Sequence, residues 1–213
     1  MDSNLENQLQ KDIRSMREAL DEDLVIAQPR MPSQPLLVAM CGLPGTGKSH
    51  FASKLSEEVP FLIMETDRLR KVIVPHPKYT TQEHRRVFNS CYQLIVYYLV
   101  NGYSVLFDAT NLNEDFRSHI YDISETTAAP LAIVHVTAPK NTVRRRLKER
   151  KANRYSNTYS DAGWLIYTRM VPVEEPVQRE HYAVDSSQNI QPILNQVIDW
   201  ARSGGRKPVP NVQ

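Results

Sequence analysis

The chain has 213 residues and a near-neutral charge, with 26 Lys and Arg against 24 Asp and Glu. This length is typical of one domain with a sizeable core. The charge disfavours a protein that coats nucleic acid along its length, so any polynucleotide contact should be local. Two cysteines, Cys41 and Cys91, exclude a disulfide framework. We expect both to be small buried residues in a reducing compartment.

The first predicted element is an amphipathic helix over Asn4–Leu24. Its apolar residues recur at spacings of three and four, at Leu5, Leu9, Ile13, Met16, Leu20 and Leu24. Three prolines follow it, so we divide the chain into helix and linker (1–35), main domain (36–202) and flexible tail (203–213). The apolar stripe either docks on the chain's own domain or forms a dimer or partner surface, and the sequence leaves both open.

No stretch of the sequence predicts a membrane segment. The first thirty residues lack the apolar core of a signal peptide. The longest uninterrupted apolar run, Leu94–Val100, is far shorter than the about 20 residues that a spanning helix needs. Together with the cysteine usage, these observations lead us to expect a cytoplasmic protein with no membrane contact.

From Leu36 onward, apolar strand-like runs alternate with helical ones, which predicts an α/β fold with a parallel sheet flanked by helices. The five predicted strands are Leu36–Cys41, Phe61–Thr66, Tyr103–Phe107, Leu131–Thr137 and Tyr182–Val184. Helices are expected over His50–Glu58 and Thr81–Asn101, the second ended by Gly102. Because ligands of open parallel sheets bind beyond the carboxyl ends of the strands, polar residues there are the first site candidates.

The segment CGLPGTGKSH, between the first strand and its helix, fits the phosphate-binding pattern G-x-x-x-x-G-K-[ST]. Glycines let the chain turn its N–H groups toward an anion, and the following helix adds its positive end. We expect Lys48 to reach the β- and γ-phosphates of ATP and Ser49 to ligate Mg²⁺. The predicted nucleotide-binding residues are Gly42, Leu43, Pro44, Gly45, Thr46, Gly47, Lys48, Ser49 and His50.

Acidic residues stand where the second and third strands end. Asp67 could accept the proton of an attacking hydroxyl, and Arg70 could hold the acceptor or the phosphoryl oxygens. Alternatively, Asp67 caps the following helix and Arg70 pairs with it on the surface. Asp108 matches the position that holds Mg²⁺, directly or through water, in P-loop enzymes. Ala109 then stands where many ATPases that activate water place a glutamate, which favours transfer to a hydroxyl over hydrolysis.

A basic segment, KNTVRRRLKERKANR, follows the fourth strand and holds eight basic residues and one acidic residue. In a helix, Val143 and Leu147 would face the sheet, while Arg146 and Arg150 flank that stripe. One interpretation is a mobile lid over Arg146–Ser160 that carries these arginines onto the phosphates. The other is an ordinary solvated face.

Four motifs in this order, GLPGTGKS, TDRLR, FDATNLNEDFR and RRRLKER, resemble the P-loop kinases related to polynucleotide 5′-hydroxyl kinase and zeta-toxin-type kinases. The resemblance covers roughly Leu36–Val171 and implies a P-loop NTPase fold of the nucleoside-kinase-like type. It also implies that Asp67 is the general base, that Arg70 helps organise the site, and that Arg146 and Arg150 are lid arginines. The segment HPKY is similar to one in zeta-type toxins, whose substrate is an activated amino sugar.

The sequence therefore predicts a kinase that uses ATP and Mg²⁺. Its acceptor hydroxyl would belong to a nucleic acid 5′ end or to a small sugar-like molecule. A second hypothesis is a regulatory ATPase or nucleotide-dependent binding module with the N-terminal helix as partner surface. A third is a nucleic-acid-binding module, against which the near-neutral charge argues.

Overall fold

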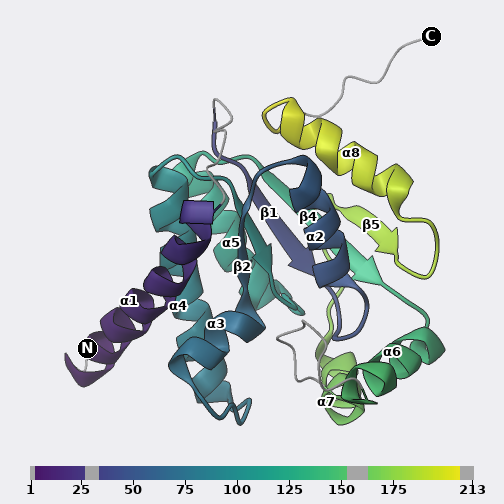
Figure 1. Ribbon diagram of the computed structural model, residues 1–213, viewed down its shortest axis with the longest axis horizontal. Helices are drawn as coiled ribbons and strands as arrows, with labels where there is room; N and C mark the ends of the chain where they lie inside the picture. The colour runs from purple at the N-terminus through teal and green to yellow at the C-terminus, as the bar shows by residue number, and fades with distance from the viewer. Residues whose placement is uncertain (1–2, 27–33, 153–162, 207–213) are drawn as a thin grey trace.

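The computed structural model describes residues 3–26, 34–152 and 163–206. Five parallel strands form one sheet in the order β2-β3-β1-β4-β5 (Figure 1). The strands are β1 (Leu37–Cys41), β2 (Leu62–Glu65), β3 (Val105–Asp108), β4 (Leu131–Thr137) and β5 (Tyr182–Asp185). The predicted five-stranded parallel α/β sheet is confirmed, and β1 lies at its centre.

Helices cover both faces of this sheet (Figure 1). They are α1 (Ser3–Ile26), α2 (Lys48–Glu58), α3 (Thr66–Ile73), α4 (Thr81–Val100), α5 (Glu114–Thr127), α6 (Lys140–Ala152), α7 (Trp164–Met170), the 3₁₀ turn η1 (Val171–Val173) and α8 (Gln191–Arg202). Helices α2 and α8 bury one face, and α1, α4 and α5 bury the other. None of the helices in the described part of the chain is long and apolar enough to cross a bilayer.

Strand β1 shows why the central strands are continuous apolar runs in the sequence. Leu37 and Ala39 point into the core that includes α1 and α4, whereas Val38 and Met40 point into the core under α2 and α8. Side chains alternate along a strand, so a strand covered on both faces needs apolar residues at every position. Both cysteines are buried and unpaired, as predicted.

Several element boundaries differ from the prediction by one or two residues, and two of these differences affect the site. Strand β2 ends at Glu65, and Thr66 already begins α3. Helix α2 begins at Lys48, two residues earlier than predicted, directly after Gly47, whose left-handed φ of 104° ends the loop. Asp67 therefore lies in the first turn of a helix, and the lysine of the glycine-rich motif is itself helical.

The apolar stripe of α1 docks on the chain's own domain. Met16 and Leu20 are fully buried in the core that includes residues of α3 and α4. Asp12 accepts hydrogen bonds from Arg86 of α4 at Nε (2.9 Å) and Nη2 (2.8 Å). Of the two interpretations of the N-terminal helix, the structure supports docking on its own domain.

Leu20→Ala should lower the free energy of unfolding by about 2–5 kcal/mol, because it leaves a cavity beneath α1. Leu5→Ala is the matched control, since Leu5 is 66% exposed on the same helix. Its effect should stay within about 0.5 kcal/mol. Denaturant unfolding followed by circular dichroism measures both values, and equally small effects would contradict docking of α1 in solution.

Candidate active site

The loop between β1 and α2 has the backbone that an anion cradle requires. Gly42, Gly45 and Gly47 have φ of 129°, 79° and 104°. A Cβ on Gly42 would lie 2.2 Å from the carbonyl oxygen of Val136, so no other residue fits there. The free N–H groups and positive end of α2 adjoin the loop. Loop and helix together form a preorganised site for phosphate groups.

Lys48 is the first residue of α2, and its side chain reaches back to this loop. Its side chain is buried, and Nζ donates a hydrogen bond to the carbonyl of Leu43 at 3.0 Å. Burial lowers the pKa of Lys48, while the carboxylates of Asp108 and Asp67 raise it. A phosphate bound in the loop could replace the Leu43 carbonyl as the partner of the Lys48 ammonium. The buried ammonium would then form an ion pair with the phosphate.

Three carboxyl groups gather where β2 and β3 end, at Glu65, Asp67 and Asp108. Glu65 and Asp108 are register partners in the sheet. Burial raises the pKa of Asp108, while Lys48 and a hydrogen bond from Ser49 lower it. Burial, followed by the charges of Asp108 and Asp67, raises the pKa of Glu65 to about 7. Sequence reasoning missed Glu65, although its place at the end of a strand was a usable signal.

The donor set around Asp108 suits Mg²⁺ that binds together with phosphates. The Ser49 hydroxyl lies near enough to the Asp108 carboxyl to lower its pKa, so two oxygen ligands lie side by side. Within the described ranges, no group of three or more His, Cys, Asp or Glu could hold a metal ion. Mg²⁺ in nucleotide sites uses one or two protein oxygens, with phosphates and waters supplying the rest. The residues present therefore fit the ion, and Ser49 and Asp108 remain its predicted ligands.

Helix α3 presents Asp67 toward this edge of the sheet without using it as a cap. The N-cap position is Glu65, and no side-chain cap hydrogen bond forms there. Arg70 pairs instead with Glu83 of α4, with 3.2 Å between Nη1 and Oε1. The side chains of this pair are only 4% and 9% exposed. The alternative of a helix cap with a surface Asp67–Arg70 pair is therefore wrong, because burial against α4 requires a partner for Arg70 there.

Helix α6 packs on the phosphate loop. Val143 and Leu147 are buried in a cluster with Leu43 of the loop and Tyr167 of α7. A Cβ on Gly45 would lie 3.0 Å from Leu147, which shows how closely the helix approaches. The prediction that these two residues face the sheet is wrong. Because α6 begins beyond the carboxyl end of β4, it lies over the edge of the sheet rather than on its face.

Arg146 ties α6 to the loop and to the end of β5. Its Nη1 donates to the carbonyl of Thr46 at 3.1 Å and to Ser186 Oγ at 2.8 Å, and Nη2 donates to the carbonyl of Ser186 at 2.9 Å. Sequence reasoning missed Ser186, because nothing in its local pattern marks a partner 140 residues from Thr46. In this conformation Arg146 holds the loop and the end of β5 together through two carbonyl groups and one hydroxyl group.

Arg150 acts electrostatically on two groups of the candidate site. Its charge lowers the pKa of both Lys48 and Glu65, which places its guanidinium within electrostatic range of the phosphate site. The two predicted lid arginines thus have different surroundings, although they share one helix. The part of the predicted lid over residues 153–160 lies outside the described residues.

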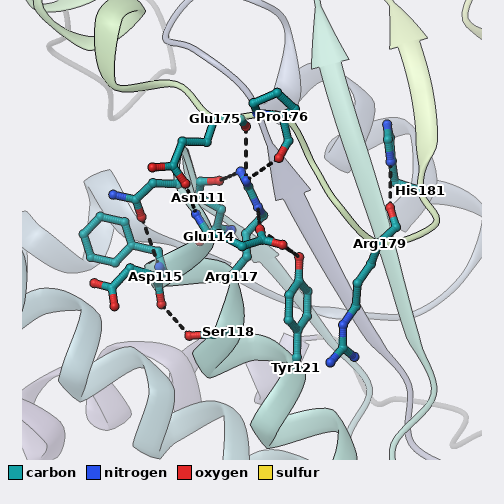
Figure 2. A network of polar contacts seen from close by, with 12 residues as sticks. Asn111, Glu114, Asp115, Arg117, Ser118, Tyr121, Glu175, Pro176, Arg179 and His181 are labelled. Carbon is teal, nitrogen blue, oxygen red and sulfur yellow. Dashed lines mark hydrogen bonds and ion pairs between the residues drawn. The ribbon is translucent and has the colours of Figure 1, made fainter.

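Figure 2 shows how Arg117 holds the loop that follows β3. The Arg117 side chain is buried, and its Nη1 donates to the carbonyl of Asn111 at 2.9 Å. Its Nη2 donates to the carbonyls of Glu175 (3.1 Å) and Pro176 (2.9 Å). Asn111 in turn donates from Nδ2 to the carbonyl of Met40 at 2.8 Å. The loop beside Asp108 is therefore fixed to β1 and to the segment before β5, a role that no spacing rule assigned to Arg117.

A central strand, a glycine-rich loop, a buried lysine and an acidic residue on the neighbouring strand define an α/β P-loop NTPase. The chain belongs to the AAA domain family, whose model matches residues 37–165. The search of curated proteins returned no significant match.

Several solved structures share this fold. Kti12 from Chaetomium thermophilum, solved with ADP-AlF3, is 17% identical, with a TM-score of 0.62 over 80% of this chain and 99% of that chain. A gluconokinase from Sinorhizobium meliloti 1021 is 18% identical, with a TM-score of 0.56 over 80% and 94%. The APS kinase CysC of Mycobacterium tuberculosis, solved with AMPPNP and APS, is 17% identical, with a TM-score of 0.58 over 80% and 99%. At these identities the likeness shows the fold.

Proposed function

We propose that the protein is an ATP-dependent kinase that transfers the γ-phosphate to an acceptor hydroxyl. The observation that carries this proposal is that Asp67, in the first turn of α3 just after β2, lies within electrostatic range of Lys48, whose pKa it raises. A carboxylate beside the phosphate-binding lysine is placed to serve as a general base. Ala109, the buried residue after Asp108, has no carboxylate that could activate water for hydrolysis of ATP.

In the proposed reaction, Asp67 takes the proton of the acceptor hydroxyl. The acceptor oxygen bonds to the γ-phosphorus, while the bond from that phosphorus to the β–γ bridging oxygen breaks and ADP leaves. Lys48 and Arg150 stabilise the charge on the transferring group. Mg²⁺, held by Ser49 and Asp108, would neutralise phosphate charge when bound.

Two acceptor classes are candidates for the proposed reaction. A nucleic acid 5′-hydroxyl is supported by the resemblance of the four sequence motifs and by the exposed basic side chains of α6. A small hydroxyl compound is supported by the gluconokinase and APS kinase that share the fold. A regulatory ATPase remains the alternative outside both classes.

The test is incubation with γ-labelled ATP, Mg²⁺ and separate panels of 5′-hydroxyl oligonucleotides, nucleosides, sugars and sugar nucleotides. Label on one panel identifies the acceptor class, and the same label should be lost in Asp67→Asn. Release of labelled inorganic phosphate that no hydroxyl compound changes would contradict the kinase and support the regulatory ATPase.

Arg150→Ala should reduce the transfer rate at saturating ATP on the order of a thousandfold, with a much smaller effect on ATP binding. The reason is that an arginine at the transferring phosphate gains strength as charge develops there. Arg145→Ala is the control on the same helix, since Arg145 is 69% exposed and its partner is Glu149, 3.8 Å away. Its transfer rate should change little.

Rates for both variants are measured with short and long acceptors at two salt concentrations. Equal losses that shrink with salt would mean that α6 acts as a diffuse basic surface, and Arg150 would lose its assigned role.

A further inference from the structure

The N-terminal helix reaches the short helix that carries Asp67. Arg68, the next residue along α3, donates from Nη2 to the carbonyl of Ala19 at 3.0 Å and to Asp23 Oδ1 at 3.2 Å. Its Nη1 pairs with the other carboxylate oxygen of Asp23. The Arg68 and Asp23 side chains are 24% and 37% exposed, so water only partly screens the pair. Both ends of the guanidinium are thus held by α1.

Helix α3 depends on its neighbours for its position. It has eight residues and no side-chain N-cap. Isolated helices shorter than about 12–15 residues are marginal in water, so tertiary contacts must hold this one in place. Leu69 anchors it in the core, Arg70 joins it to α4 through Glu83, and Arg68 joins it to α1.

Helix α1 is itself firmly attached, so it can act as a support. Beyond its buried apolar stripe, it holds Arg86 of α4 through Asp12, and Tyr98 of α4 donates to Asp21 at 2.8 Å. Figure 1 shows α1 running alongside α3 and α4. It also lies outside residues 37–165, which the family model matches. The part of the support for α3 that α1 gives therefore comes from outside the family-matched region.

We propose that α1 positions Asp67, through the contacts of Arg68 with Asp23 and with the carbonyl of Ala19. This inference rests on the proposed kinase function. Arg68 and Asp67 are adjacent on one short helix. A shift of α3 that breaks the contacts of Arg68 with α1 therefore also moves the Asp67 side chain. A displacement of about 1 Å at a reacting group can cost on the order of a hundredfold in rate.

The expected signature is a large effect on rate with a small effect on stability. A partly exposed ion pair contributes only about 0.2–1 kcal/mol to folding. A purely structural role would therefore leave the rate of the folded enzyme unchanged. Asp23→Ala should lower kcat of phosphoryl transfer on the order of ten- to a hundredfold, with an unchanged KM for ATP.

Asp12→Asn is the matched control, because it breaks the ion pair between α1 and Arg86 of α4 without touching α3. It should cost at least as much stability, since Asp12 is only 4% exposed, yet leave kcat at the wild-type value. Exchanging the charges, with Arg68→Asp and Asp23→Arg together, should recover part of the rate that Asp23→Ala loses. Equal kcat values for Asp23→Ala and Asp12→Asn would overturn the positioning role.

Amide hydrogen exchange gives a second readout that does not need the reaction. Asp23→Ala should speed exchange in α3 while α4 keeps its wild-type protection. Unchanged exchange in α3 would also overturn the inference. If the wild-type protein transfers phosphate to no acceptor, the proposed function fails, and the exchange experiment still decides whether α1 holds α3.

Discussion

Lys48→Ala should abolish nucleotide turnover, with a loss of at least on the order of a thousandfold. Lys48 is a buried cation at the start of α2, directly after the phosphate loop, where the low dielectric strengthens its attraction to the β- and γ-phosphates. Its removal also leaves the Asp108 and Asp67 carboxylates facing the phosphates without a nearby ammonium. We therefore expect ATP affinity and turnover to fall together.

The control is Lys54→Ala, a change on the exposed side of the same helix, where Lys54 pairs with Glu57. This variant should bind and turn over ATP like the wild type. Calorimetric titration with ATP and Mg²⁺ gives the affinity, and phosphate release or transfer gives the rate. Wild-type values of both in Lys48→Ala would refute the phosphate-loop assignment.

Asp67→Asn should lower phosphoryl transfer by about two to four orders of magnitude while ATP binding stays nearly intact. The amide keeps the shape of the side chain but cannot take the proton of the acceptor. Asp67 is not the N-cap of α3, so this substitution should cost little folding stability. Single-turnover transfer and ATP titration separate the two effects.

Glu65 supplies a comparison for Asp67, because it lies at the same strand end. Glu65→Gln removes a neighbouring carboxyl without removing the proposed base, so its transfer rate should fall less than that of Asp67→Asn. Transfer above about a tenth of the wild-type rate in Asp67→Asn would mean that another group takes the proton.

Local patterns were sufficient to predict the loop that we assign to phosphate binding. The glycines, Lys48 and Ser49 lie within one short segment, and the residue types themselves indicate the backbone conformation of the loop. The alternation of apolar strands and helices predicted the parallel sheet, because a strand buried on both faces must be apolar throughout. Asp108 directly follows the apolar run of the third predicted strand, so the same rule predicted that it lies at the carboxyl end of that strand.

Only the tertiary structure decided which distant groups meet around that segment. Arg70 has Glu83 as its partner rather than Asp67, and Arg146 reaches Thr46, which is 100 residues away in the chain. Spacing rules describe neighbours on one helix or strand, whereas these contacts arise where separate elements pack and buried charges must find partners. Docking of α1 was equally undecided by its periodicity, because an apolar stripe shows that a face is covered without showing what covers it.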